Sequence, residues 1–223
     1  MSTSADGLTW DPAVLQRLIT AQRLSSYTAA TGGHLDEALA LYEWNVSASA
    51  AVLTTTAMVE VLVRNSLDTQ LLRWASRRGA SAWFDVVQLD DQGHRDLRTA
   101  RARAAKRGPE VHGRVVAELT FGFWRYLAAS RYLTSLWVPA TAAAFPLAPA
   151  DLRRRRVDVE KRLQRIHFVR NRAAHHEPIH RRALGRDLAA TIELSAWISP
   201  DAAAWVTGRS PMRAVIDARP HGT

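Results

Sequence analysis

The chain has no cysteine and no long uncharged apolar run. The absence of cysteine from 223 residues excludes disulfide scaffolds, thiolate metal sites and cysteine nucleophiles. No stretch of about 18 residues lacks charged or strongly polar side chains, so the sequence predicts no transmembrane span. The opening residues also lack the basic and apolar regions of a secretory signal. We therefore expect a soluble, cytoplasmic protein with no membrane partner.

Acidic residues and lysine are also scarce. The chain has 21 acidic against 30 basic residues, a formal net charge of +9, and its pI is about 11.0. An excess of this size favours an anionic partner, nucleic acid before membrane. Lys106 and Lys161 are the only lysines, and arginine forks suit phosphate oxygens. Codon use in a GC-rich genome would also explain the arginine-to-lysine ratio, but it does not explain the net charge.

Helical patterns run through most of the chain. Asp11-Pro12 is typical of a helix start, and residues 36–74 contain neither proline nor glycine, which predicts one long helix or two nearly continuous ones. The sequence therefore predicts an all-α protein. With 47% hydrophobic residues, we expect one core: a single helical domain over residues 1–206, its core at about 36–198, followed by a flexible tail over 207–223.

The densest group of reactive side chains lies where a predicted helix must end, before Pro178. An arginine, an amide and two imidazoles fall there within about two helical turns; they are Arg170, Asn171, His175 and His176. Cleavage of an RNA strand needs a base for the 2′-hydroxyl proton, an acid for the leaving 5′-oxygen and a cation for the phosphate charge. Histidine and arginine supply these without a metal. A helix C-terminus also attracts both residue types through its dipole alone.

Helical spacing bears on which histidine would act. Asn171 and His175 are four residues apart and share a helical face, so the amide could orient the ring. Arg172 and His176 have the same spacing, one step around the helix. We favour His175 as the acid/base, with His176 as the alternative, and Arg170 as the residue that holds the phosphate.

The same segment contains an HExxH match over residues 176–180. In zinc peptidases both histidines project from one face of an unbroken helix, whereas here Pro178 stands between His176 and His180 and interrupts the helix. We interpret the match as accidental, and we expect neither a metal nor another cofactor.

Two further groups are candidates for supporting roles. Val63-Arg64-Asn65 repeats the tripeptide Val169-Arg170-Asn171, which suggests two related helices that face one site. Glu60 and Arg64 are spaced as an intrahelical ion pair worth about 0.3–0.5 kcal/mol, or they could fix Arg170 or contact RNA. Weaker candidates for contacts to the RNA backbone are Arg172 and the run Arg153, Arg154, Arg155 and Arg156, although a charge run is more often a solvated helix face.

Three blocks between about residues 36 and 180 carry a family resemblance. They are Leu41–Asn45 leading to Val59–Asp68, Glu118–Trp124 and Val169–Ile179. The last block contains an R-x4-6-H pattern, with polar Asn171 directly after Arg170. In this order the blocks resemble the Abi-like abortive-infection family of the HEPN superfamily. The resemblance implies a HEPN-like antiparallel helical bundle with extra peripheral helices, and a homodimer that joins two such motifs in a composite active site.

The activity that the resemblance implies is that of a metal-independent endoribonuclease, a toxin or phage-defence effector that leaves cyclic 2′,3′-phosphate and 5′-hydroxyl ends. Besides RNA, an antitoxin of unknown kind, RNA or protein, would be a partner. HEPN toxins controlled by a nucleotidyltransferase carry a tyrosine two residues after the histidine, where this chain has Glu177 or Pro178, so that control is not expected. Two alternatives stay open: a non-catalytic RNA-binding or regulatory module of the same fold, and a structural helical protein whose charge reflects codon use.

Overall fold

The described part of the chain is mostly helical. Its structure, a computed structural model, describes residues 2–3, 9–106 and 108–220. The strands in these residues are β1 (Ser2–Thr3) and β2 (Thr9–Trp10), which pair antiparallel. The α-helices are α1 (Pro12–Ile19), α2 (Ala21–Ala30), α3 (Leu35–Ser76), α4 (Asp91–Ala105), α5 (His112–Glu118), α6 (Phe121–Tyr126), α7 (Leu152–Ala174), α8 (Leu184–Ile198), α9 (Pro200–Arg209) and α10 (Met212–Asp217). Shorter helical turns are η1 (Trp83–Asp85), η2 (Ser130–Tyr132), η3 (Leu133–Trp137) and η4 (Thr141–Ala144). The prediction of an all-α protein is confirmed.

Several helices begin at side chains that satisfy their first backbone N–H groups. Asp11 Oδ1 accepts a hydrogen bond from the Ala13 N–H at 2.8 Å, and Asp90 Oδ1 accepts one from the Gly93 N–H at 2.8 Å. Pro12 occupies the first position of α1, where a missing N–H removes no helical bond. Both caps form within three residues of the chain, and this is why Asp11-Pro12 marked the start of α1 in the sequence.

The chain divides into two compact units. The first comprises Met1–Thr54, Val169–Arg186 and Ser210–Thr223, and the second comprises Thr55–Phe168 and Asp187–Arg209. Three of the boundaries fall inside α3, α7 and α8. These three helices run without a break across the boundaries, so no proline-rich or glycine-rich linker marks the boundaries in the sequence. For this reason the sequence predicted a single domain.

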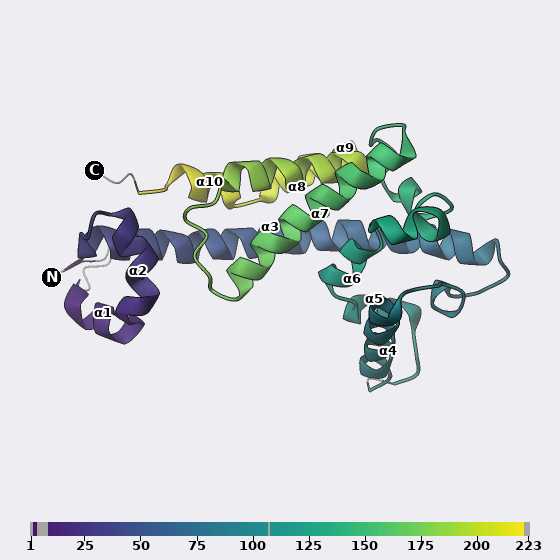
Figure 1. The fold of residues 1–223 in the computed structure, drawn as a ribbon, viewed down its shortest axis with the longest axis horizontal. Coiled ribbons are helices and arrows are strands. Elements are labelled where there is room, and N and C mark those ends of the chain that lie inside the picture. The colour runs from purple at the N-terminus through teal and green to yellow at the C-terminus, as the bar shows by residue number, and fades with distance from the viewer. Residues whose placement is uncertain (1, 4–8, 107, 221–223) are drawn as a thin grey trace. The chain divides into compact units, whose positions relative to one another are not determined.

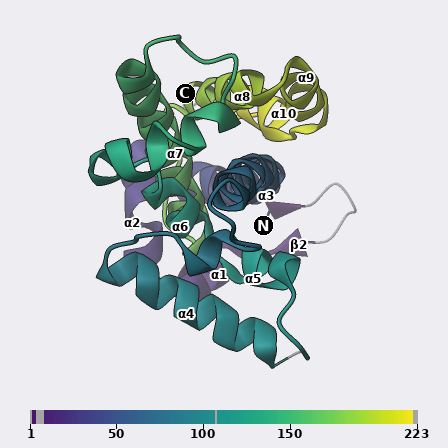
Figure 2. The ribbon, with the colours of Figure 1, turned by 90° about the vertical axis from the view of Figure 1, so that its right-hand side faces the viewer.

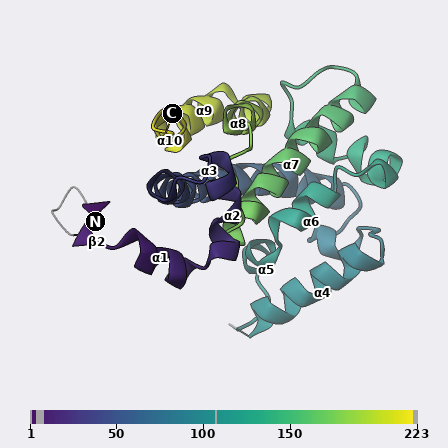
Figure 3. The same cartoon turned by 60° about the vertical axis from the view of Figure 1, so that its left-hand side comes forward.

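The first unit joins both ends of the chain to the start of α3. Figures 1 and 3 show α2 beside the N-terminal part of α3, and the rings of Tyr27 and Tyr42 meet there edge to face at 5.4 Å. On α3, the Trp44 indole N–H donates to the Val215 carbonyl of α10 at 2.7 Å. Residues 207–223 were expected to form a flexible tail, but this segment contains α10, and the side chain of Met212 is buried in the unit.

The second unit has an aromatic core. Figure 2 shows α4 and α5 side by side, with α6 next to them. Trp83 and Trp124 are fully buried in this core, and their rings meet at 6.0 Å. Phe121 and Phe123 of α6 are buried with them, so these rings pack inside the unit and are not available to stack on a base. Tyr126, at the end of α6, is exposed.

Helix α3 is long and apolar enough to cross a membrane by its length and composition alone. Of its most apolar 18-residue window, 44% is buried inside the structure. The core helix of a soluble protein has the same properties, so this helix is weak evidence for a membrane span. The cytoplasmic location therefore stays a prediction.

Candidate functional site

Helix α7 ends in a Schellman motif. The Glu177 N–H donates to the Arg172 carbonyl at 2.8 Å, and the His176 N–H donates to the Ala173 carbonyl at 3.1 Å. Between these bonds His176 has a φ of 56°, a left-handed conformation that glycine usually adopts at a helix end. A side chain there costs about 1–2 kcal/mol, although histidine tolerates the conformation better than most residues. The chain therefore places an imidazole where glycine would be more stable.

Arg172 holds this turn closed. Its Nη2 donates to the Pro178 carbonyl at 2.8 Å, and its Nη1 lies 3.0 Å from Glu177 Oε2. These two positions usually make a hydrophobic contact in a Schellman motif, and here they make an ion pair. Arg172 was a weak candidate for RNA contact, whereas the structure gives its guanidinium a role in shaping the turn.

The four residues proposed for catalysis lie together in the first unit. Arg170 and Asn171 are half-buried, and Arg170 Nη1 donates to Asn171 Oδ1 at 3.3 Å. His175 is exposed, and its backbone N–H donates to the Asn171 carbonyl at 3.0 Å. The end of α7 thus presents a guanidinium and two imidazoles to solvent, in a chain with an excess of positive charge.

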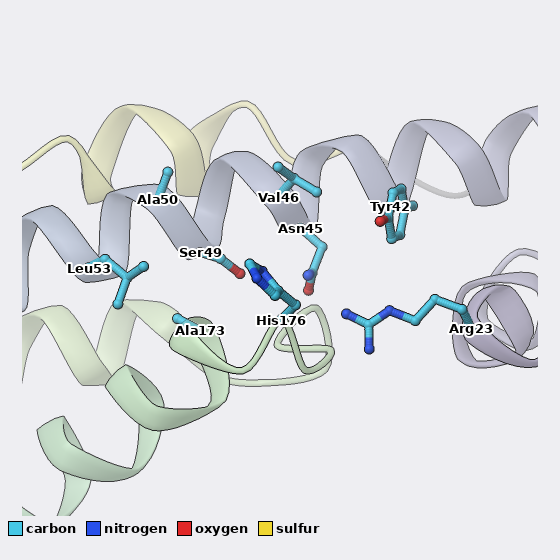
Figure 4. A pocket seen from close by; sticks show the side chains of 9 residues that line it. All are labelled: Arg23, Tyr42, Asn45, Val46, Ser49, Ala50, Leu53, Ala173 and His176. Atoms are coloured by element: carbon cyan, nitrogen blue, oxygen red, sulfur yellow. The ribbon is translucent and has the colours of Figure 1, made fainter. Parts of the chain in front are cut away.

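A small pocket opens beside this helix end. It has a volume of about 220 Å³ and is lined by Arg23, Tyr42, Asn45, Val46, Ser49, Ala50, Leu53, Ala173 and His176. Figure 4 shows the Arg23 guanidinium directed toward the His176 ring, with Asn45 between them. His175 does not line this pocket. The spacing argument favoured His175, whereas the pocket contains His176.

Four polar residues of the pocket were missed from the sequence: Arg23, Tyr42, Asn45 and Ser49. The last three lie on α3 at intervals of three and four residues, which places them on one face of the helix. A polar stripe in an otherwise apolar helix was the sequence signal that could have identified them. Arg23 lies on α2, and nothing in the sequence connects it to α7.

Asn45 positions the segment that follows α7. Its side chain is 3% exposed, and its Oδ1 accepts a hydrogen bond from the Ile179 N–H at 2.7 Å. Ile179 is buried, so this bond fixes the chain just beyond the Schellman turn. The position of His176 is therefore set from both sides, by α7 before it and by Asn45 after it.

The two histidines of the HExxH match have different environments. Both lie beyond the last residue of α7, so they do not share a helical face. His176 is exposed, whereas His180 is 1% exposed and packs against Tyr27, with ring centroids 4.5 Å apart and the rings tilted by 38°. Burial, and then the charges of Arg181 and Arg219, hold the pKa of His180 below its usual value. Burial also raises the pKa of Tyr27 to about 12, so both rings are neutral at pH 7.

The predicted supporting residues belong to the second unit. Glu60 and Arg64 are half-buried and Asn65 is exposed, all on α3. Arg64 Nε donates to Asn65 Oδ1 at 3.4 Å. This contact links two members of the repeated Val-Arg-Asn tripeptide, just as Arg170 is linked to Asn171 in the other copy.

The arginine run at the start of α7 does not form one basic surface. Arg155 donates to the carbonyls of Pro149, Ala142 and Ala148. Arg156 is 8% exposed and donates to the Ala128 carbonyl at 2.8 Å and to Glu160 at 2.6 Å. These two guanidinium groups hold the second unit together. Only Arg153 and Arg154 of the run are exposed, and Arg154 lies 3.6 Å from Asp158.

Comparison with known proteins identifies no relative: no protein-family model, no curated protein and no solved structure matches this chain. The resemblance to the Abi-like family therefore rests on the three sequence blocks alone.

Proposed function

We propose that this protein is a metal-independent endoribonuclease of the HEPN type, with its active site at the end of α7, and that it acts as a toxin or phage-defence effector. The observation that carries the proposal is the strained conformation of His176, which faces Arg23 at a small pocket. Backbone strain at a polar residue is typical of functional sites. A glycine in the same turn would remove both the strain and the imidazole.

The reaction needs only imidazole and guanidinium groups, the kinds of side chain that the end of α7 carries. An imidazole removes the proton from a ribose 2′-hydroxyl, and the 2′-oxygen attacks the adjacent phosphorus. The bond to the 5′-oxygen breaks, and the leaving oxygen receives a proton from a second acid. Arg170 would stabilise the charge that grows on the phosphate. The products are a cyclic 2′,3′-phosphate and a 5′-hydroxyl end.

Two imidazoles compete for the role of base. His175 is favoured because it lies four residues after Asn171, on the same helical face. His176 is favoured because its side chain lines the pocket. In a HEPN-like homodimer the facing motif of the second copy would supply the second acid/base and a second guanidinium. The family role, the dimer and the antitoxin remain parts of this proposal.

Incubation of purified protein with end-labelled single-stranded RNA in EDTA tests the activity. We expect cleavage that leaves cyclic 2′,3′-phosphate ends, and we expect Arg170→Ala to slow it about 100-fold or more. His175→Ala and His176→Ala, made separately, identify the base by the larger loss. Arg209→Ala, which removes an exposed charge at the end of α9, is the matched control and should cleave normally.

Two results would contradict the proposal. One is wild-type protein that leaves RNA intact, and the other is cleavage that survives the combined loss of Arg170, His175 and His176. RNA binding that weakens steeply with salt but yields no product would indicate the non-catalytic RNA-binding module instead.

A further inference from the structure

One buried hydroxyl faces the pocket. Ser49 is 7% exposed, and its Oγ has no hydrogen-bond partner among the residues that the structure describes. Figure 4 shows this oxygen directed into the pocket, toward the His176 ring. A buried polar group without a partner costs about 1–3 kcal/mol. The cost is recovered if a ligand supplies the missing partner.

The remaining walls determine what kind of ligand fits. Val46, Ala50, Leu53 and Ala173 form an aliphatic surface, which suits the flat face of a heterocycle. A volume of about 220 Å³ is smaller than the roughly 300–1,000 Å³ of sites for drug-sized ligands. The pocket therefore admits one ring system and excludes a base pair or a dinucleotide.

The cationic groups of the pocket suit a phosphate. Arg23 is half-buried at the end of the pocket opposite Leu53, and a guanidinium offers paired donors to phosphate oxygens. His176 stands between Arg23 and the aliphatic wall, as Figure 4 shows. A ligand that touches the wall, Ser49 and Arg23 together has a ring at one end and a phosphate at the other.

We infer that this pocket, which we call the base pocket (Arg23, Asn45, Val46, Ser49, Ala50 and His176), binds one nucleotide of a single-stranded RNA. The base lies against the aliphatic wall with its edge hydrogen-bonded to Ser49 Oγ, and the phosphate lies on Arg23. This inference rests on the proposed function and adds to it a source of base preference. Because hydrogen bonds to a base edge differ among the four bases, the protein should prefer one of them at this position.

Binding of fluorescein-labelled RNA octamers, one homopolymer for each base, tests the inference. All variants carry Arg170→Ala and the buffer contains EDTA, so that binding is measured without cleavage. We expect one homopolymer to bind at least about tenfold more tightly than the weakest, and Ser49→Val to reduce this preference to about threefold or less. Ser47→Val, at an exposed position of the same helix outside the pocket, is the matched control.

Two more variants probe the wall and the phosphate. Ala50→Leu fills the pocket from an exposed helical position and should weaken binding of the preferred homopolymer about tenfold or more. Arg23→Gln should weaken all four homopolymers and lower the slope of log affinity against log salt by about one. Arg17→Gln, on exposed α1 of the same unit, controls for the loss of one charge.

Thermal unfolding separates a binding role of Ser49 from a structural one. Ser49→Val removes an unpaired buried hydroxyl and should leave Tm unchanged or higher, while a structural serine would lower Tm and binding together. The inference is overturned if the Arg170→Ala parent binds all four homopolymers equally, or if Ser49→Val and Ala50→Leu, each made in that parent, both bind as the parent does. A nucleoside monophosphate that binds as tightly as the octamer would overturn the assignment to RNA. If RNA binding is base-selective but the wild type does not cleave RNA, the proposed enzymatic function is wrong and the inference about the base pocket still holds.

Discussion

At the scale of single residues, adjacent histidines at the end of α7 should respond oppositely to the same substitution. His176 has a left-handed φ of 56°, so His176→Gly relieves a steric cost. We expect the free energy of unfolding to rise by about 0.5–1 kcal/mol and Tm by about 1–4 °C, measured by circular dichroism. The same variant should lose RNA cleavage if His176 acts on the substrate.

His175→Gly is the control for this experiment. His175 is not among the positive-φ residues of the described chain, so glycine adds only backbone entropy to the unfolded state and should lower stability by about 0.5–1 kcal/mol. Equal shifts in Tm for the two variants would show that backbone strain does not distinguish the two histidines.

At the scale of elements, the contact between α2 and the segment after α7 should make the first unit sensitive to acid. His180 is buried against Tyr27, and burial lowers its pKa below the ordinary value of 6.5. The unfolded chain binds a proton at this histidine below about pH 6.5, and the folded chain does so only at lower pH. Stability is therefore fully present above pH 6.5 and is lost progressively as the pH falls through the window down to the folded pKa.

Urea unfolding at pH 7.5 and 5.5 measures this loss. We expect wild type to lose more of its free energy of unfolding between these pH values than His180→Gln, which has no titrating ring. His34→Gln, on an exposed residue before α3, should behave as wild type does. A pH dependence that is identical in wild type and His180→Gln would rule out a contribution from His180.

Local chemistry explains how far the elements could be predicted from the sequence. Asp11, Pro12 and Asp90 mark helix starts through bonds within a few residues, and Pro178 requires α7 to end before it. The apolar and aromatic pattern of residues 110–137 favours a pair of core helices, but this segment contains α5, α6 and the two shorter turns η2 and η3. Its aromatic side chains are buried from several directions, and tertiary packing of this kind overrides local helical propensity.

At the scale of the whole molecule, the proposed composite site predicts complementation between inactive copies. Arg170→Ala and His176→Ala each remove one group, and a mixed dimer of the two retains one arginine and one histidine at the shared site. We expect the mixture to recover measurable cleavage of labelled RNA after subunit exchange, when neither variant cleaves alone at the same total concentration. If the mixture stays as inactive as its components, each copy must hold a self-contained site.

The candidate site could be predicted only where it is continuous in the chain. Four of its residues lie within one segment of seven, so their proximity could be predicted from the sequence: Arg170, Asn171, His175 and His176. Arg23 and Ser49 reach His176 only through the fold of the first unit. No periodicity links residues this far apart, and this is why the sequence indicated a reactive helix end but not the pocket beside it.

The discontinuous origin of the base pocket has an evolutionary consequence. Its lining comes from α2, from one face of α3 and from the turn after α7, and of these residues Asn45 is tied to the turn by a hydrogen bond. Ser49 and Arg23 can diverge while Arg170 and the histidines stay the same. If descendants of this chain retain the reaction, the pocket gives them a means to change which RNA position they attack through single substitutions in α2 or α3.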